Sequence, residues 1–172
     1  MAVLLQLRIE LAVQLVNLLP RLLVLDELAD QKVRALPDLL VEPGPRYPVP
    51  HLLERGYEVW FVTSAKDEEL EHHMAELEAE GKVSGVVNSS AVENPKPAPD
   101  IFELTLERAG ASPDETVAVG DAIWDIESAS AAGIRTVAVL TGGAFCRQEL
   151  EDAGAAGVYK DCAALLESGF PD

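Results

Sequence analysis

The sequence predicts an α/β fold, in which helices cover both faces of a parallel sheet in a doubly wound, Rossmann-like arrangement. From about residue 50 onward, short apolar runs rich in β-branched residues alternate with amphipathic segments of helical length. Strands that alternate with helices at this spacing are typical of βαβ units, whose strands run parallel. Polar residues suited to chemistry follow three of the apolar runs, and ligands bind at the carboxyl ends of strands in such sheets.

The composition of the 172-residue chain restricts its function. With 48% hydrophobic and 25% charged residues, the chain has the composition of one globular domain with a core. Its formal net charge of −17 argues against a face for nucleic acid or for an anionic membrane. A small anionic ligand remains compatible, because one Mg²⁺ ion or a few cations can reverse the charge of a pocket.

The N-terminal residues predict neither a membrane span nor a secretory signal. Arg8 and Glu10 interrupt the first apolar run, and the next run is shorter than the roughly 18 residues that a span requires. The two cysteines, Cys146 and Cys162, form no CxxC motif, so we expect reduced thiols. These features predict a cytoplasmic protein.

The first 49 residues are expected to form an irregular segment, separate from an α/β core over residues 50–172. Residues 5–15 fit a strand and a helix equally well. Residues 22–26, LLVLD, predict a short buried strand that ends in an acid. A loop is predicted after it, because proline disrupts helices and sheets. The prolines that crowd there are Pro37, Pro43, Pro45, Pro48 and Pro50.

From residue 50 the elements can be assigned in order. Runs such as YEVWFV, which are β-branched and aromatic, predict strands, and glycines after amphipathic segments predict helix ends. The predicted strands cover 57–62, 85–87, 116–119, 136–140 and 157–159. The predicted helices cover 50–55, a segment that Ser64 caps and Gly81 ends, 99–109, 124–132 and 147–152.

Three polar signals follow carboxyl ends of predicted strands. Thr63 follows YEVWFV, and Lys96 lies between two prolines after the next strand. Asp121 and Asp125 follow TVAV. Each signal has a structural alternative: a helix cap by Thr63 or Ser64, an exposed loop lysine, and acids that stabilise a helix N-terminus by about 0.3–1 kcal/mol. Because parallel strands end at one edge, we expect the signals to converge there.

Two other features belong to the same edge. Trp124, beside the two acids, is expected to pack on the sheet rather than to stack on a ligand. Thr141, Gly142 and Gly143 are expected to form a flexible loop that could approach a substrate.

The segments around these residues resemble a known family. VWFVTSAK, NPKPAPDIFELTLERAG, VAVGDAIWDIESASAAGI and VAVLTGG, between about residues 50 and 168, are similar to the catalytic core of the haloacid dehalogenase superfamily. The similarity is greatest to its phosphoglycolate-phosphatase and β-phosphoglucomutase-like branch. The resemblance implies a Mg²⁺-dependent, phosphatase-like hydrolase that acts on a small phosphorylated metabolite.

The resemblance also implies roles for the site residues. Thr63, with Ser64, would bind the phosphoryl group, and Lys96 would neutralise charge on that group and on the attacking carboxylate. Asp121 would ligate Mg²⁺, and Asp125 would ligate the ion or order its waters. Oxygen ligands at one strand end suit Mg²⁺, which also bridges to phosphate oxygens.

The family's first motif, DxDGT after a strand, does not occur in this sequence. Its first Asp is the nucleophile and its second the general acid/base. The nearest candidate nucleophile is Asp26 in LLVLDELAD, but Leu28 stands where the second Asp belongs, and leucine cannot transfer a proton. The 36 residues between Asp26 and Thr63 leave room for little or no cap domain.

Two functions therefore stay open. One is a hydrolase of this superfamily with impaired activity. The other is a non-catalytic remnant or truncated chain that acts as a binding or interaction module. A receiver-like signalling domain fits less well, because the KPAPD segment and its distance to GDxxxD are not those of a receiver. The sequence indicates neither the substrate nor the oligomeric state.

Overall fold

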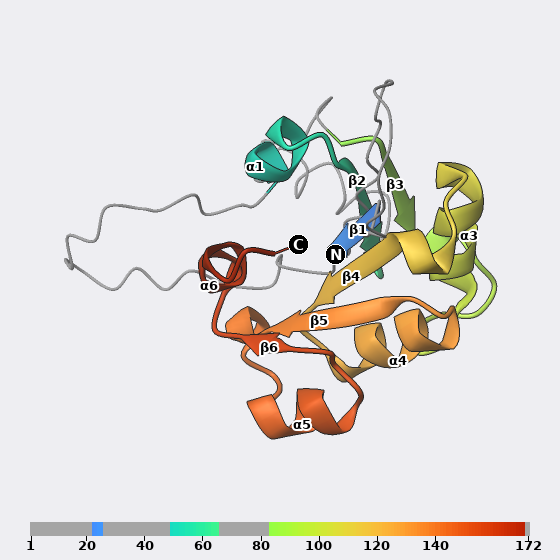
Figure 1. Ribbon diagram of the computed structural model, residues 1–172. Helices are drawn as coiled ribbons and strands as arrows, with labels where there is room; N and C mark the ends of the chain where they lie inside the picture. Colours follow the sequence, from blue (N-terminus) through green and yellow to red (C-terminus); the bar gives the residue numbers. More distant parts are fainter. Residues whose placement is uncertain (1–21, 26–48, 66–82, 171–172) are drawn as a thin grey trace.

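The computed structural model describes residues 22–25, 49–65 and 83–170. Six parallel strands of these residues form one sheet in the order β3-β2-β1-β4-β5-β6. Figure 1 shows the sheet between layers of helices, which confirms the predicted doubly wound α/β class. The strands are β1 (Leu22–Leu25), β2 (Glu58–Thr63), β3 (Gly85–Asn88), β4 (Thr116–Gly120), β5 (Arg135–Val139) and β6 (Val158–Tyr159).

Helices cover both faces of this sheet. Residues of α1 and α6 pack on one face and residues of α3 and α4 on the other, while α5 packs beside α4 and β6. The helices are α1 (Val49–Glu54), α3 (Asp100–Ala109), α4 (Ile123–Ala131), α5 (Arg147–Asp152) and α6 (Cys162–Glu167). Short 3₁₀ turns are η1 (Ser89–Ala91), η2 (Pro113–Glu115) and η3 (Leu140–Gly142).

The two cores follow from the alternation of side chains along β2. Val59 and Phe61 pack with α1 and α6, whereas Trp60 and Val62 pack with α3. All four are buried, which explains why the strand reads as a continuous apolar run. Full burial of one such side chain contributes roughly 1.5–3 kcal/mol to the free energy of unfolding. Packing on both faces therefore fixes β2 between the helices.

The predicted elements agree closely with the observed ones where the structure describes them. Every predicted strand there, and the four predicted helices observed as α1, α3, α4 and α5, match to within one residue at each end. The sequence reading missed α6 and the 3₁₀ turns. The helix predicted between Ser64 and Gly81 falls almost wholly on residues 66–82, outside the described part.

The N-terminal segment contributes one strand to the described structure. The strand predicted at residues 22–26 is confirmed over Leu22–Leu25, where β1 lies between β2 and β4. Asp26, the candidate nucleophile, lies outside the described residues. The division of the chain at residue 50 stays a prediction, and β1 belongs to the same sheet as the later strands.

Nothing among the described helices is both long enough and apolar enough to cross a membrane.

Candidate active site

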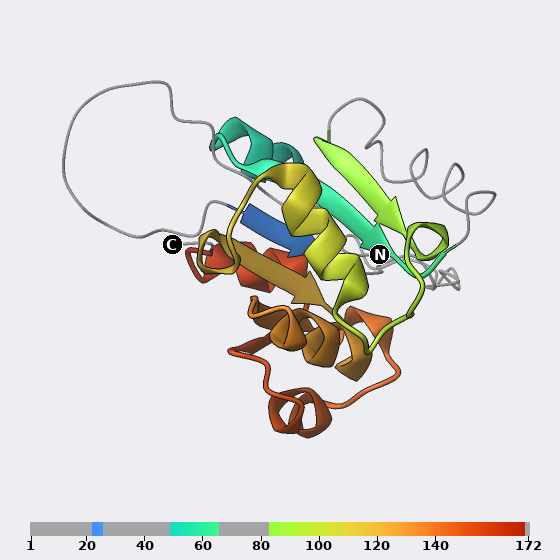
Figure 2. The same ribbon diagram turned by 90° about the vertical axis from the view of Figure 1, so that its right-hand side faces the viewer.

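Parallel strand order brings the predicted site residues to one edge of the sheet. Thr63 is the last residue of β2, and Asp121 directly follows β4. β1 pairs with both strands, so the ends of β2 and β4 are separated by one strand. Figure 2 shows the arrowheads of these strands on the same side of the molecule, next to the start of α4. The predicted convergence of the strand ends is therefore observed.

A buried ion pair joins two of the predicted residues. The Lys96 ammonium donates to Oδ1 of Asp125 at 3.0 Å, and the two side chains are only 5% and 6% exposed. Lys96 also lies 5.6 Å from the centroid of the Phe102 ring, a cation–π distance. The alternative of an exposed loop lysine is thus wrong, because the ammonium is buried and contacts side chains of α4 and α3.

Asp125 also caps the helix to which it belongs. The backbone N–H of Ala122 donates to its Oδ2 at 3.1 Å, and that of Asp121 at 3.4 Å. The N-cap residue Ala122 has no polar side chain, so Asp125 satisfies N–H groups that the helix itself leaves open. The helix-cap explanation therefore holds for Asp125, together with its pairing to Lys96.

Asp121 is packed against a glycine of the next strand connection. A Cβ atom on Gly142 would lie 2.3 Å from Oδ2 of Asp121 and 2.6 Å from its Cγ. Similarly, a Cβ atom on Gly120 would lie 2.7 Å from Cβ of Asp125. No side chain fits in either place, so the two glycines leave the volume that the two carboxylates occupy.

Thr63 is fully buried at the end of β2. Its Oγ1 accepts a hydrogen bond from the backbone N–H of Ala65 at 2.9 Å, which fixes the turn after the strand. Ser64, between them, is exposed. The structure thus places the hydroxyl of Thr63 at the sheet edge, with a local structural bond of its own.

The charge of Asp121 acts on a neighbouring thiol. Burial, together with the nearby carboxylates of Asp161 and Asp121, raises the pKa of the Cys162 thiol to about 12. The thiol of Cys162 therefore stays protonated and unreactive at neutral pH. Cys146 is exposed, and neither cysteine forms a disulfide.

The donors at this edge fit a magnesium ion. Residues 22–25, 49–65 and 83–170 contain no cluster of three or more His, Cys, Asp or Glu side chains that could hold a metal. Mg²⁺ does not need such a cluster, since it keeps several waters and uses one or two carboxylates with phosphate oxygens. Asp121 and Asp125 supply carboxylate oxygens at this edge, and both oxygens of Asp125 are also engaged by Lys96 and by backbone N–H groups.

Other contacts at this edge differ from the sequence reading or extend it. Trp124 does not pack on the sheet: it is 49% exposed and meets the ring of Phe145 edge-on. The 141–143 loop was expected at this edge, but its steric contact with Asp121 was not. The pairing of Lys96 with Asp125 was also missed, although a lysine and an acid at one predicted edge were a signal for it.

The family comparison agrees with this geometry. The sequence model of the haloacid dehalogenase-like hydrolase family matches residues 25–139, a region that begins one residue before Asp26. A phosphorylated carbohydrates phosphatase of Thermotoga maritima is 28% identical over 132 residues, which are 76% of this chain and 61% of that protein. The pyrophosphatase PpaX of Bacillus mycoides is 34% identical over 91 residues, which are 53% and 42%. The chain thus spans between about two fifths and three fifths of these relatives.

Solved structures share the same core. A Thermotoga maritima protein assigned as a β-phosphoglucomutase superposes with a TM-score of 0.67 at 26% identity, over 76% of this chain and 60% of that one. CbbY of Rhodobacter sphaeroides, in complex with phosphate, superposes with a TM-score of 0.61 at 24% identity, over 68% and 52%. The second likeness shows the fold alone.

Proposed function

Because this chain belongs to the haloacid dehalogenase-like hydrolase family, we propose that it hydrolyses a phosphomonoester of a small metabolite with Mg²⁺, at a low rate. The observation that carries the proposal is the buried Lys96–Asp125 pair beside Asp121 at the carboxyl edge of the sheet. Phosphoryl transfer needs mainly positioning and neutralisation of charge. A fixed, desolvated ammonium next to a carboxylate suited to Mg²⁺ supplies both.

Each described residue takes a defined part in this proposal. An ammonium carries three donors, so Lys96 can serve Asp125 and a phosphoryl oxygen at once. Asp125 positions that ammonium, and Thr63 with Ser64 lines the phosphoryl position at the end of β2. Asp121 holds Mg²⁺, which when bound neutralises charge on the phosphate oxygens.

Asp26 is the proposed nucleophile. Support comes from the family match, which includes it, and from β1, the strand before it, which lies between β2 and β4. A carboxylate oxygen of Asp26 would attack phosphorus while the bond from phosphorus to the leaving oxygen breaks. Water would then hydrolyse the aspartyl phosphate and release inorganic phosphate.

Leu28 limits the rate of this reaction. It has no proton to give, so the leaving oxygen must take its proton from water. A general acid typically contributes about 10²–10⁴ in rate, and an alkyl oxygen, which is a poor leaving group, depends on it most. The proposed activity is therefore weak, and weaker on alkyl than on aryl phosphates.

Hydrolysis assays with three proteins test this proposal. With Mg²⁺, the native chain should hydrolyse p-nitrophenyl phosphate slowly, and Asp26→Asn should abolish that activity. Leu28→Asp should raise hydrolysis of an alkyl phosphate such as glycerol phosphate by a larger factor than hydrolysis of p-nitrophenyl phosphate. Turnover that survives Asp26→Asn would contradict the assigned nucleophile.

A second candidate function is a binding module without turnover, which Leu28 in place of the acid/base favours. In that case the chain would bind inorganic phosphate and Mg²⁺ in calorimetry, and no phosphomonoester would be hydrolysed by the native chain or by Leu28→Asp. Under both candidates the ligand is a small phosphorylated molecule and not nucleic acid, in keeping with the net charge of −17. We place the protein in the cytoplasm, which the two free cysteines support.

A further inference from the structure

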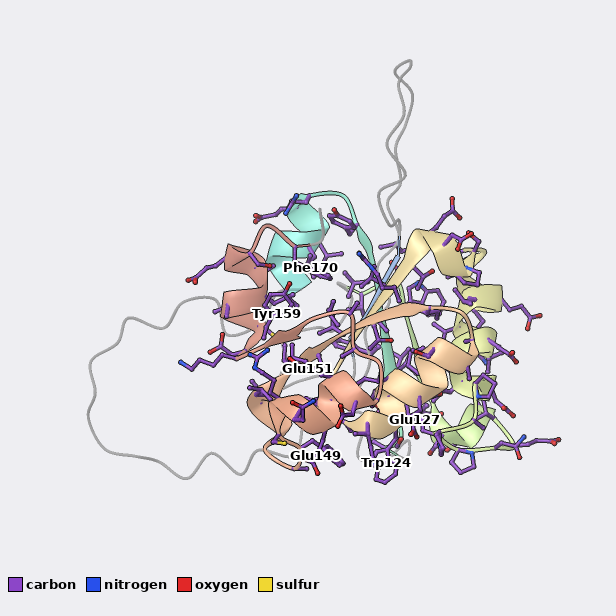
Figure 3. The ribbon with its side chains drawn as sticks, turned by 60° about the horizontal axis from the view of Figure 1, so that its bottom comes forward. Trp124, Glu127, Glu149, Glu151, Tyr159 and Phe170 are labelled. Carbon is purple, nitrogen blue, oxygen red and sulfur yellow. The ribbon has the colours of Figure 1, made fainter. Side chains whose placement is uncertain are left out.

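An aromatic pair lies beside the candidate site without belonging to it. Trp124 is the large hydrophobic side chain that is exposed among residues 22–25, 49–65 and 83–170, and its ring meets that of Phe145 at 5.9 Å and 80°. Figure 3 shows Trp124 at the start of α4, projecting outward from the sheet. A half-exposed tryptophan contributes little to a core, so its position calls for another explanation.

Phe145 lies in a segment that packs against Asp121. This segment, residues 140–146, joins β5 to α5 and is called here the β5–α5 loop. Three residues before Phe145 the loop passes so close to Asp121 that a Cβ atom on Gly142 would touch its carboxylate. Gly143 follows in a left-handed conformation, with φ of 68°. A backbone with two consecutive glycines has wide conformational freedom, so it needs an anchor to stay in place.

The anchor comes from both sides of the loop. Phe145 is half-buried and packs against the core cluster formed by Ile126 of α4 and Leu150 of α5. Trp124 covers it from the first turn of α4, the turn whose Asp125 also holds Lys96. The first turn of α4 therefore makes both contacts. Asp125 binds the ammonium of Lys96, and Trp124 contacts Phe145 of the β5–α5 loop.

We infer that Trp124 and Phe145 form an aromatic clasp that holds the β5–α5 loop against Asp121 and so positions the carboxylate for Mg²⁺. The inference rests on the proposed function, which assigns the metal to Asp121. Trp124 is a positioning residue here, since it acts on Asp121 through Phe145 and the glycines. Loss of the clasp would let the loop move and the carboxylate with it, which weakens metal binding more than it weakens the fold.

Calorimetric titration of the full chain with Mg²⁺ tests this inference without any need for turnover. An edge-to-face pair has an effect equivalent to about a three- to tenfold change in an equilibrium constant. We expect Trp124→Ala to weaken Mg²⁺ binding by about that factor, and Trp124→Phe, which keeps a ring, to bind within about twofold of the native chain. Ser130→Ala, an exposed change on the same helix, should leave the affinity unchanged.

A second variant separates the clasp from a general structural role. Phe145→Leu keeps an apolar side chain in the core cluster but removes the ring, so it should weaken Mg²⁺ binding as Trp124→Ala does. The double variant should bind Mg²⁺ no more weakly than either single variant. Each of the two changes removes the same contact between the rings, so their effects do not add. The melting temperature of each apoprotein should shift little, since Trp124 is half-exposed and leucine at position 145 keeps an apolar contact with the core cluster.

The outcomes separate the clasp from the proposed function. Native-like Mg²⁺ affinity in both Trp124→Ala and Phe145→Leu would overturn the clasp and leave the proposed metal site standing. Additive effects in the double variant would also overturn it. If the native chain itself bound no Mg²⁺, the metal site would fail, and the clasp would fail with it.

Discussion

Gly142 is the residue whose replacement should disturb the candidate metal ligand most directly. A methyl group there would lie 2.3 Å from Oδ2 of Asp121, so the carboxylate must move. We expect Gly142→Ala to weaken Mg²⁺ binding at least about tenfold, measured by calorimetry. Gly110→Ala, at the C-terminal end of α3, is the matched control: nothing lies within 4 Å of its Cβ, but its φ of 64° makes alanine strained. It should therefore lower stability and leave the Mg²⁺ affinity near the native value.

Thr136 offers a prediction on stability alone. Its buried Oγ1 has no hydrogen-bond partner in the part of the chain that the structure describes, and an unsatisfied buried polar group costs about 1–3 kcal/mol. Valine has nearly the same shape, so Thr136→Val should raise the free energy of unfolding by about 1 kcal/mol or more. Thr105→Val is the control, since the hydroxyl of Thr105 donates to the carbonyl of Ile101. Thr105→Val should lower the free energy of unfolding by about 0.5–1.5 kcal/mol, because it removes this hydrogen bond.

Urea denaturation of the native chain and both variants measures the difference. If the Thr136→Val protein were no more stable than the native chain, the hydroxyl of Thr136 in the native chain would have a hydrogen-bond partner in solution.

At the residue scale, the sequence could predict which side chains carry chemistry but not how they share contacts. Thr63, Lys96 and Asp121 were predicted from their positions after strands and from family motifs, both of which depend on nearby residues. The packing of Gly142 on Asp121 joins the ends of β4 and β5. A contact of this kind depends on the strand order, which no local pattern encodes.

The first turn of α4 combines three tasks at the scale of one element. Asp125 caps the turn and holds Lys96, and Trp124 covers Phe145. Removal of one member of a buried ion pair typically costs about 3–5 kcal/mol, because the other charge is left uncompensated. Lys96→Met and Asp125→Ala should therefore each lower the free energy of unfolding by several kcal/mol.

The double variant checks that this loss comes from the pair. Lys96→Met/Asp125→Ala leaves no buried charge, so its loss of stability should be clearly smaller than the two single losses together. Chemical denaturation of all four proteins gives the coupling energy of the cycle. Additive losses would mean that the ion pair contributes no coupling and that only packing and the helix cap are lost.

Element boundaries were predictable where a local signal was strong. Buried strands of apolar and β-branched residues, and helices with glycine at their ends, matched to within one residue. The helix α6, CAALLE, was missed although the equally short helices α1 and α5 were predicted. A signal for it does exist, since Asp161 accepts a hydrogen bond from the backbone N–H of Ala164 as an N-cap.

For the whole molecule, the doubly wound sheet explains how weak local signals become one site. The fold class was predictable because alternating strands and helices leave few topologies. The position of β1 between β2 and β4 was not predictable, because nothing in its four apolar residues encodes which strands they pair with. This central position is also what supports Asp26 as a proposed nucleophile in a chain without the DxDGT motif.

The central claim is that Asp121 holds Mg²⁺ at the edge of this sheet. The most direct test is thermal melting with and without millimolar Mg²⁺, because a ligand of the native state stabilises it by RT ln(1 + [L]/Kd). Asp114→Asn is the charge-matched control, since Asp114 lies in η2 just before β4, at the opposite end of that strand. The account predicts a Mg²⁺-dependent rise in Tm for the native chain and for Asp114→Asn, and none for Asp121→Asn. An equal rise in all three proteins would contradict it.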